Sequence, residues 1–367
     1  MTATLKKIKL VLEDGNEFEG ISFGDENSIS GEVVFNTAMT GYPESLTDPS
    51  YKGQILVLTY PLVGNYGVPN NDKELNLHKF YESHELHISG LIISDYSHEY
   101  NHWNASMSLG EWLKMHKVLG ISGIDTRALT KILREKGTML GKIIVDNKQV
   151  DFYDPNQENL VAKVSIKEKE TYGNGKLKIL LVDCGVKYNI IRHLVSRDTT
   201  VIRVPWNHDI SKEEYDGLFV SNGPGDPKQC RETIKNLAAA FKKNKPIFGI
   251  CLGNQLMGLA AGADTYKLKY GHRSHNQPVL QKGTNKAYIT SQNHGFAINN
   301  NTLTKEWEAL FVNLNDNTNE GIKHVSKPFF SSQFHPEASG GPTDTEYLFD
   351  EFINKIKAYK AKKGVEV

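Results

Sequence analysis

The stretch at residues 246–255, PIFGICLGNQ, decides the fold of the second half of the chain. A short apolar run ends at Cys251, and Gly249 and Gly253 stand two residues before and after it. Glycines at this spacing give room for a sharp turn from strand to helix, which lifts the central side chain out of the backbone. The helix that starts at Leu252 directs its N–H groups and positive dipole end toward the sulfur, which favours a thiolate. We interpret Cys251 as a candidate nucleophile.

A second motif, SQFHPEAS, supplies His335 and Glu337 on either side of Pro336. Pro336 disfavours helical geometry at His335, and residues two apart on an extended segment point to the same side. An imidazole beside a carboxylate is a base with a fixed orientation, so Cys251, His335 and Glu337 form a candidate triad. Taken alone, a buried cysteine is more often a small hydrophobic residue than a nucleophile. A third motif, SNGPGDP at 221–227, taken alone is more often a simple surface turn than part of a site. All three together, each at the end of an apolar run, favour a reactive site.

The composition excludes several kinds of partner. Forty-three basic and 43 acidic residues cancel, which leaves no electrostatic argument for nucleic acid. The chain is 39% hydrophobic and 23% charged, as ordinary globular proteins are, and no apolar run approaches the roughly 18 residues of a membrane span. The three cysteines are far apart, so neither a disulfide framework nor a structural zinc site is expected from them. We expect a cytoplasmic protein without membrane contact.

The length of 367 residues predicts two domains. In residues 1–150, short apolar runs at 8–12, 31–35, 54–58 and 88–93 are separated by turn signals and predict strands. A helix is predicted between Asp125, a plausible cap, and Gly137, a typical stop. The first domain is therefore expected to be mixed α and β. Residues 151–176 are polar and irregular, which is typical of a linker.

The second domain, residues 177–362, is predicted to be doubly wound α/β with a largely parallel sheet. Short apolar runs alternate with helical patterns up to residue 262, which indicates a sheet covered by helices on both faces. Beyond that point, strands are predicted at 266–271, 276–280 and 321–336, among others, and a core-packing helix at 347–359. Reactive groups collect at the carboxyl ends of such strands, so we expect residues 183–185, 222–225 and Cys251 to converge.

The motifs resemble a known family. GICLGNQ, SNGPGDP, QNHGF at 292–296 and FHPEAS are similar to motifs of class I glutamine amidotransferase domains. In the first domain, GEVVFNTAMTGYPESLTDPSYKGQILVLTYPLVGNYG and GISGIDTRALTKILREKG resemble the small, glutamine-hydrolysing subunits of carbamoyl phosphate synthetases. The resemblance extends from residue 9 to about residue 359, and the linker is its least similar part.

The resemblance implies roles for individual residues. It makes Cys251 the nucleophile, His335 the acid and base, and Glu337 the residue that orients His335. It also implies contacts to glutamine from Ser50, Gly223, Gly225, Leu252, Gln255, Asn293, Gly295 and Phe296. Polar and backbone groups among these are suited to hold the α-amino and α-carboxylate groups of the substrate. The N–H of Leu252, with that of Gly223 or Gly225, is suited to form an oxyanion hole, because Pro224 has no N–H. Lys187, Asn189 and His294 also match the family pattern, with functional and structural roles both open.

The implied reaction is that of a ligase with a glutaminase half-reaction on this chain. A γ-glutamyl thioester forms on Cys251, and ammonia passes to a large partner subunit that makes carbamoyl phosphate from bicarbonate and ATP, for arginine and pyrimidine biosynthesis. The sequence has no GxxxxGK[ST] phosphate loop, so ATP and Mg²⁺ are expected on the partner and no cofactor on this chain. A hetero-oligomer of small and large subunits is therefore expected.

Two other functions and one further kind of site were weighed against this interpretation. A free-standing amidase or peptidase would leave the first domain unexplained, and a non-catalytic, glutamine-binding regulator has no need of all three triad residues. His272, His275 and His294 lie in motif-rich loops, which suggests a metal site. A cysteine-dependent amidase needs no Lewis acid, and no acidic cluster accompanies these histidines in the sequence, so no metal is expected.

Overall fold

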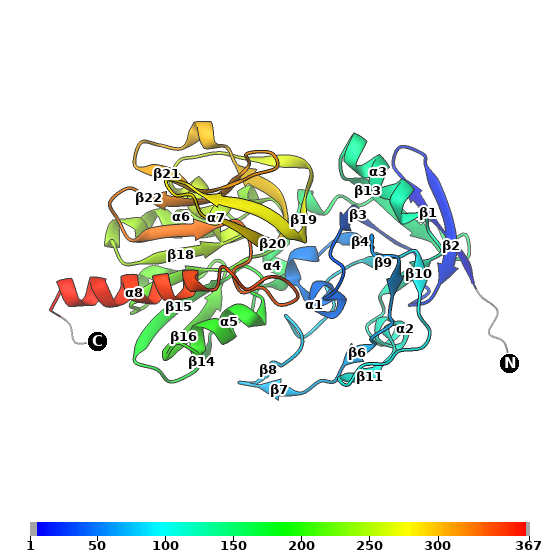
Figure 1. The fold of residues 1–367 in the computed structure, drawn as a ribbon, viewed down its shortest axis with the longest axis horizontal. Helices are drawn as coiled ribbons and strands as arrows, with labels where there is room; N and C mark the ends of the chain where they lie inside the picture. Colours follow the sequence, from blue (N-terminus) through cyan, green and yellow to red (C-terminus); the bar gives the residue numbers. More distant parts are fainter. Residues whose placement is uncertain (1–5, 365–367) are drawn as a thin grey trace. The chain divides into compact units, whose positions relative to one another are not determined.

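The chain divides into two compact units, Met1–Gln157 and Glu158–Val367, and the computed structural model describes residues 6–364 (Figure 1). The division falls inside the segment that the sequence indicates as a linker. That segment contains three short elements, namely η2 (Pro155–Gln157), α4 (Val161–Val164) and β14 (Glu170–Tyr172). Each unit is described by itself below.

Within residues 6–157, a closed barrel of seven strands forms the centre of the first unit. In barrel order the strands are β1 (Lys7–Leu12), β13 (Met139–Ile144), β3 (Ile29–Asn36), β4 (Gln54–Leu58), β9 (Gly90–Ile92), β12 (Leu119–Ser122) and β2 (Glu17–Ser22). The pairs β3–β4, β4–β9 and β9–β12 are parallel, and the other four are antiparallel. Successive residues of a strand alternate between its two faces, so Val34 and Leu56 pack into an apolar cluster outside the barrel with Trp112.

Short elements complete the first unit. They are the paired strands β5 (Leu62–Val63) with β10 (Asp95–Tyr96), β6 (Val68–Pro69) with β11 (Ala105–Met107) and β7 (Lys73–Glu74) with β8 (Leu77–His78), and the helices α1 (Tyr42–Thr47), η1 (Pro49–Tyr51), α2 (Leu109–Met115) and α3 (Thr126–Lys136). The predicted ends of α3 are confirmed. The Asp125 carboxylate accepts the N–H of Ala128 at 2.8 Å, and Gly137 ends the helix with a φ of 107°.

The described part of the second unit holds a ten-stranded sheet. Its order is β14, β16 (Thr199–Pro205), β15 (Leu177–Asp183), β17 (Gly217–Val220), β18 (Ile247–Ile250), β23 (Phe329–Ser332), β22 (Asn319–His324), β21 (Trp307–Asn313), β19 (Thr265–Gln281) and β20 (Ala287–Ile298). The strands from β16 to β23 are mutually parallel, and the others join antiparallel. The predicted α/β class is confirmed, with the parallel strands concentrated at the centre of the sheet.

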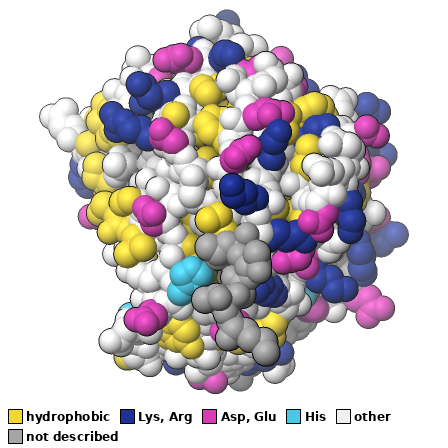
Figure 2. Space-filling model, turned by 90° about the vertical axis from the view of Figure 1, so that its right-hand side faces the viewer, with side chains coloured by type: hydrophobic (Ala, Val, Ile, Leu, Met, Phe, Trp, Pro, Cys, Tyr) yellow, Lys and Arg dark blue, Asp and Glu magenta, His cyan; other side chains and the backbone are white. Residues whose placement is uncertain are grey.

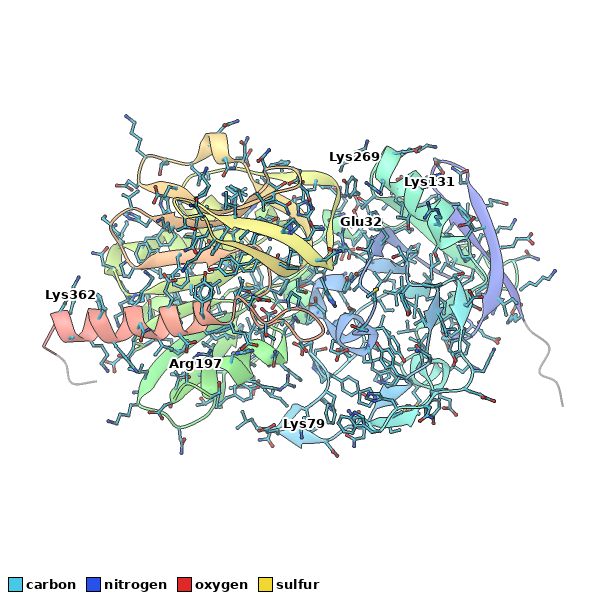
Figure 3. The ribbon with its side chains drawn as sticks, in the orientation of Figure 1. Glu32, Lys79, Lys131, Arg197, Lys269 and Lys362 are labelled. Carbon is cyan, nitrogen blue, oxygen red and sulfur yellow. The ribbon has the colours of Figure 1, made fainter. Side chains whose placement is uncertain are left out.

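Helices cover both faces of this sheet, as expected for a doubly wound fold. On one face, α6 (Arg231–Ala240) and α7 (Leu252–Ala260) pack in one apolar cluster with β15 and β17. On the other face lie α5 (Tyr188–Val195) and α8 (Tyr347–Lys362), where Phe349 and Phe352 contact Phe219 of β17. Arg197, just after α5, pairs with Asp350 of α8 at 2.8 Å (Figure 3). The 3-10 turns are η3 (Ile210–Lys212), η4 (Pro227–Gln229), η5 (Phe241–Lys243) and η6 (Asn300–Thr302).

Three strand predictions in the last third of the chain were wrong in detail. Residues 266–271 and 276–280 belong to a single strand, β19, whose pairing with β20 shifts register twice. These irregularities let one strand bend where the sequence suggests two, because Gly271 adopts a φ of +71°. The run at 321–336 divides into β22 and β23.

The surface matches the balanced charge of the sequence. On the face in Figure 2, Lys and Arg side chains lie interspersed with Asp and Glu side chains. None of the helices in the described range combines the length and apolar character needed to cross a membrane.

Candidate active site

Cys251 occupies a strained turn between β18 and α7. Its backbone has a φ of 54° and a ψ of −103°, a conformation that residues other than glycine rarely adopt. A Cβ on Gly249 would lie 2.7 Å from the Gly253 backbone, and a Cβ on Gly253 would lie 2.2 Å from the carbonyl oxygen of Val220. The two glycines therefore make the turn sterically possible, as the sequence indicates.

His335 and Glu337 meet just beyond the end of β23. His335 Nδ1 lies 2.6 Å from Glu337 Oε1, and both side chains are buried. The His335 N–H donates to the carbonyl oxygen of Ser291 at 2.9 Å, which fixes the backbone of this loop against β20. Burial alone would lower the pKa of His335, but the charge of Glu337 and the nearby Cys251 outweigh it and raise that pKa to about 10. The imidazolium form of His335 is therefore favoured.

Lys187 is a third charged residue beside His335 and Glu337. Its Nζ donates to Glu337 Oε1 at 3.0 Å and to the carbonyl oxygen of Ala338 at 2.9 Å, although the lysine is only 5% exposed. Burial would raise the pKa of Glu337, but Lys187 and His335 overcome this and lower it to about 2. Asn189 donates from its side-chain amide to the Glu337 carbonyl oxygen. Both residues, whose roles the sequence leaves open, thus hold Glu337 in place.

The thiol of Cys251 faces β20. Its Sγ lies 3.6 Å from the carbonyl oxygen of Asn293, and the Cys251 N–H donates to Ser332 of β23 at 2.8 Å. Cys251 also acts on the ring of His335, whose pKa it raises through its charge and a hydrogen bond. The structure therefore brings Cys251, His335 and Glu337 together with Asn293 at one end of the sheet.

The predicted convergence of loops is confirmed. A Cβ on Gly223 would lie 2.0 Å from the carbonyl oxygen of Cys184 and 2.9 Å from the side chain of Leu252. The Lys187 N–H donates to the Asn222 side chain at 3.1 Å, which ties the same loops together. Leu252 is the first residue of α7, so its N–H belongs to the helix turn that has no intrahelical acceptor. Of the two glycines considered for the oxyanion hole, Gly223 is the one in contact with Leu252.

Gln255 and Gly295, two other predicted glutamine contacts, both lie against neighbouring polar groups. Gln255 is buried, and its amide nitrogen already donates to the carbonyl oxygen of Phe296 at 2.8 Å and to Gln333 Oε1 at 3.2 Å. Its contact with glutamine remains a prediction. Gly295 lies beside Arg273 on β19, since a Cβ there would meet the guanidinium at 3.2 Å.

Gly225 and Ser50 each pack within their own part of the chain. Gly225 has a φ of +83° and packs against Leu160. Ser50 is a buried residue of η1 in the first unit, where its N–H donates to Asp48 Oδ1 at 2.9 Å. Their contacts with glutamine remain predictions.

Sequence reasoning missed Gln333 and Asn254. Asn254 Nδ2 donates to Gln333 Oε1 at 2.9 Å, and both side chains are fully buried. Their positions inside GNQ and two residues before His335 are the only sequence signal. Their hydrogen bond joins the start of α7 to the segment that leads to His335.

The three histidines that the sequence suggests as metal ligands lie in strands and not in loops: His272 and His275 in β19 and His294 in β20. His272 and His294 lie together with the buried Glu320, and Asp316 lies 2.9 Å from His272 Nε2. The expectation that no acidic cluster accompanies these histidines holds along the sequence but not in the folded chain. There, β22 supplies Glu320 and the turn before it supplies Asp316. Burial and the charges of Lys187 and His335 lower the pKa of His275 to about 4, so it stays neutral.

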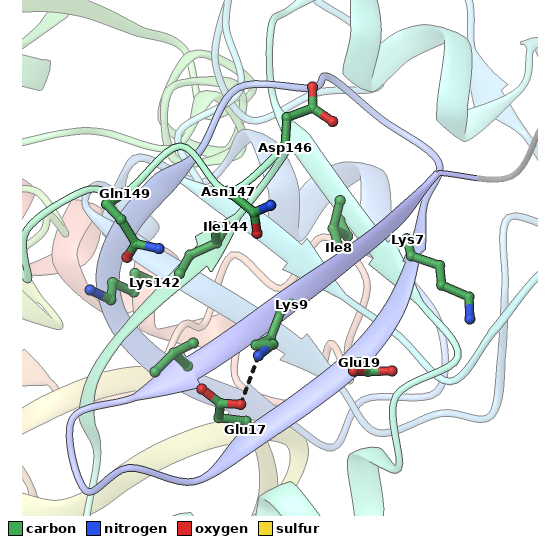
Figure 4. A pocket seen from close by; sticks show the side chains of 11 residues that line it. Lys7, Ile8, Lys9, Glu17, Glu19, Lys142, Ile144, Asp146, Asn147 and Gln149 are labelled. Atoms are coloured by element: carbon green, nitrogen blue, oxygen red, sulfur yellow. Dashed lines mark hydrogen bonds and ion pairs between the residues drawn. The ribbon is translucent and has the colours of Figure 1, made fainter.

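A hollow of about 510 Å³ in the first unit offers no comparable chemistry (Figure 4). Exposed charged side chains line it, and Lys9 pairs with Glu17 across it at 2.8 Å. No cysteine, serine or histidine is among its lining residues. The site around Cys251 therefore remains the candidate active site.

The fold and the nucleophile turn of the second unit define a class of protein. Residues 180–355 match the model of the family described as glutamine amidotransferase class-I. The second unit is therefore a class-I glutamine amidotransferase domain. Residues 10–143 match the model described as carbamoyl-phosphate synthase small chain, CPSase domain.

Curated relatives narrow the assignment. The chain is 50% identical over 374 residues to the carbamoyl phosphate synthase arginine-specific small chain of Neurospora crassa, covering 99% of this chain and 83% of that one. The chain belongs to the carbamoyl-phosphate synthase small-chain family. It is also 54% identical over 357 residues to the human carbamoyl-phosphate synthase (ammonia), mitochondrial, and 52% over 358 residues to the multifunctional protein CAD of Squalus acanthias. These matches cover 96% of this chain but only 24% and 16% of the two longer proteins.

Proposed function

We propose that this chain hydrolyses L-glutamine and delivers ammonia to a synthetase partner that makes carbamoyl phosphate from bicarbonate and ATP. One observation carries the proposal: the strained turn at Cys251 stands beside a buried His335 whose Nδ1 is 2.6 Å from Glu337. Acyl transfer from an amide uses a nucleophile, a base that activates it and a carboxylate that orients the base, and Cys251, His335 and Glu337 match these three roles.

The first half of the reaction forms a thioester. The Cys251 thiolate attacks the side-chain amide carbon of glutamine, and the negative charge moves to the amide oxygen. The N–H groups of Leu252 and Gly223 are the proposed donors to that oxygen, and a single such donor typically contributes about 100- to 1000-fold in rate. His335 gives its proton to the amide nitrogen, the C–N bond breaks, and ammonia leaves.

The second half regenerates the enzyme. Neutral His335 takes a proton from a water molecule, which attacks the thioester carbon. The C–S bond breaks, glutamate leaves, and Cys251 returns as a thiolate beside imidazolium. Glu337, neutralised on its other side by Lys187, keeps the His335 ring oriented through both steps.

The intact triad residues favour glutamine as the nitrogen source for this chain. The human relative carries ammonia in its name, which makes direct use of ammonia the competing hypothesis. A site that only received ammonia would have no use for a strained cysteine paired with a buried imidazolium. The same argument disfavours a regulator that binds glutamine without hydrolysing it, and the match of the first unit to the small-chain family disfavours a free-standing amidase.

Partner, cofactors and location form part of the same proposal. The sequence holds no GxxxxGK[ST] loop, so ATP and Mg²⁺ chemistry is assigned to a large synthetase subunit in a hetero-oligomer. Arginine and pyrimidine synthesis are the proposed destinations of the carbamoyl phosphate. Cys184, Cys230 and Cys251 are all unpaired, which supports a reducing, cytoplasmic location.

The Cys251→Ser variant tests the proposal. Serine keeps the shape of the turn but removes the thiolate, so glutamate release should vanish while ammonia-driven synthesis with the large subunit persists. Retained glutamate release would overturn the assignment of the nucleophile. For the partner, co-purification with a large ATP-dependent subunit is expected. A chain that stays alone and turns over glutamine at full rate would contradict that part.

A further inference from the structure

A buried polar cluster lies on β19, β20 and β22, and the proposed glutaminase steps do not use it. His272, His294 and Glu320 are 7%, 4% and 0% exposed. One side-chain nitrogen or oxygen from each residue lies within 4.8 Å of the others. Three potential metal ligands from three different strands thus meet inside the protein.

The outward nitrogen of each imidazole is already held by an acceptor. His272 Nε2 lies 2.9 Å from Asp316 Oδ2, and His294 Nδ1 lies 2.9 Å from the carbonyl oxygen of Phe296. An acceptor at one ring nitrogen leaves the other nitrogen as the one that a metal ion takes, with the loss of any proton it carries. His272 Nδ1 and His294 Nε2 are therefore the nitrogens directed at the centre of the cluster.

Two side-chain oxygens face the same two nitrogens. Glu320 Oε1 lies 3.3 Å from His272 Nδ1 and 4.0 Å from His294 Nε2, and Gln292 Oε1 lies 2.9 Å and 3.1 Å from the same atoms. A tetrahedral ion with bonds of about 2.0–2.1 Å to four ligands separates them by about 3.3 Å. The four separations, from 2.9 to 4.0 Å, lie around that value.

The orientation of Gln292 creates a mismatch that a cation resolves. The Thr290 hydroxyl donates to the carbonyl oxygen of Gln277 at 2.9 Å, so its oxygen accepts from Gln292 Nε2 at 3.1 Å. This fixes Gln292 Oε1 toward the imidazoles. With its proton on Nδ1, which faces the Phe296 carbonyl oxygen, His294 turns the lone pair of Nε2 toward Gln292 Oε1, and two acceptors stand 3.1 Å apart.

Glu320 supplies a second unmatched group. Its Oε1 accepts from Asn313 at 3.0 Å, whereas its Oε2 has no hydrogen-bond partner among the described residues. A fully buried carboxylate oxygen without a partner is costly. Asp316 and Glu320 place two carboxyl groups within 3.3 Å of the His272 ring nitrogens, and two carboxyl groups suit a divalent ion.

We propose that this cluster binds one Zn²⁺ ion, with His272 Nδ1, His294 Nε2, the Glu320 carboxylate and Gln292 Oε1 as ligands. Asp316 and the Phe296 carbonyl orient the two imidazoles from behind, as carboxylates and carbonyls do in zinc sites. Four protein ligands leave no open position, so the ion is structural. It fixes the part of β20 that carries Asn293, the residue whose carbonyl oxygen lies beside Cys251 Sγ.

The test is a zinc titration of the purified full chain after treatment with a chelator, using a competing chromophoric chelator as the indicator. We expect one Zn²⁺ per chain, confirmed by elemental analysis, and a Co²⁺ form with the visible spectrum of a tetrahedral site that lacks a sulfur-to-cobalt band. His272→Gln and Glu320→Gln should weaken binding by at least about 10- to 100-fold. Glu308→Gln, the same change at an exposed ion pair on β21, should bind as the wild type does.

Cys251→Ser separates this cluster from the triad, because a thiolate and an imidazole also attract zinc. The variant should keep its one Zn²⁺. The proposal is overturned if folded wild-type protein takes up no stoichiometric zinc. It is also overturned if zinc is lost in Cys251→Ser but kept in Glu320→Gln. These outcomes do not depend on glutamine hydrolysis, so they stand apart from the test of the proposed function.

Discussion

Replacing Glu337 by glutamine removes one negative charge from the triad and leaves its shape in place. Oε1 of Glu337 accepts from His335 Nδ1 at 2.6 Å and from Lys187 Nζ at 3.0 Å, and an amide oxygen at the same position can accept both bonds. The variant therefore isolates the charge of Glu337 from its hydrogen bonds.

The expected loss of activity in Glu337→Gln follows from the pKa of His335. Burial would lower the pKa of His335, yet Glu337, as the largest opposing cause, helps raise it from 6.5 to about 10. That difference corresponds to about 5 kcal/mol in favour of the imidazolium. Without the charge of Glu337, the pKa of His335 falls and the imidazolium form is held less strongly at neutral pH. We expect kcat/KM for glutamine to fall about 100- to 10,000-fold, the range for a misadjusted acid–base group.

Glutamate release measured against pH is the assay. The alkaline limb of kcat/KM should move to lower pH in Glu337→Gln, because the imidazolium form then ends at a lower pH. Glu308→Gln makes the same chemical change at an exposed pair and should leave rate and profile as they are. A Glu337→Gln enzyme within tenfold of the wild type, with its alkaline limb unmoved, would refute the reasoning.

Three further predictions concern stability around the same turn. Lys187→Met leaves Glu337 buried with its main cation removed, which should cost about 3–5 kcal/mol of unfolding free energy, and an unchanged melting temperature would contradict this. Gly253→Ala places a Cβ 2.2 Å from the Val220 carbonyl oxygen, so overpacking should cost at least about 1–3 kcal/mol in urea unfolding and slow glutamine hydrolysis; wild-type values for both would speak against the crowded turn. The pKa of Glu337 is lowered from 4.5 to about 2, so the stability it contributes is present above pH 4.5 and disappears as the pH falls toward 2. Urea unfolding of Glu337→Gln should accordingly depend less on pH in that window, and an identical dependence would count against the ion pair.

Local signals in the sequence were enough to predict the nucleophile turn and the helix ends. The spacing of Gly249 and Gly253 around Cys251 reports a steric requirement of a few neighbouring residues, and the strained backbone at Cys251 meets that requirement. Asp125 and Gly137 likewise act within one helical turn. The approach of His335 to Glu337 follows from their spacing across Pro336.

Contacts between distant strands left no comparable signal. Lys187 reaches Glu337 across 150 positions of the chain, and nothing in its neighbourhood indicates which carboxylate it meets. Glu320 joins His272 and His294 only because the antiparallel strands of the sheet bring them together. The barrel of the first unit closes through the pairing of β1 with β13, which joins Lys9 to Ile144. Such pairings depend on the packing of whole elements, so residue patterns alone predicted the strands but not their partners.

The covalent intermediate tests the central claim most directly. Rapid acid quenching of the enzyme during turnover of glutamine, followed by digestion and mass spectrometry, should find a γ-glutamyl group on the peptide that contains Cys251, and none on the peptides with Cys184 or Cys230. The label should be absent from Cys251→Ser. A γ-glutamyl group on another residue, or turnover of glutamine with no label on Cys251 at any quench time, would contradict the account.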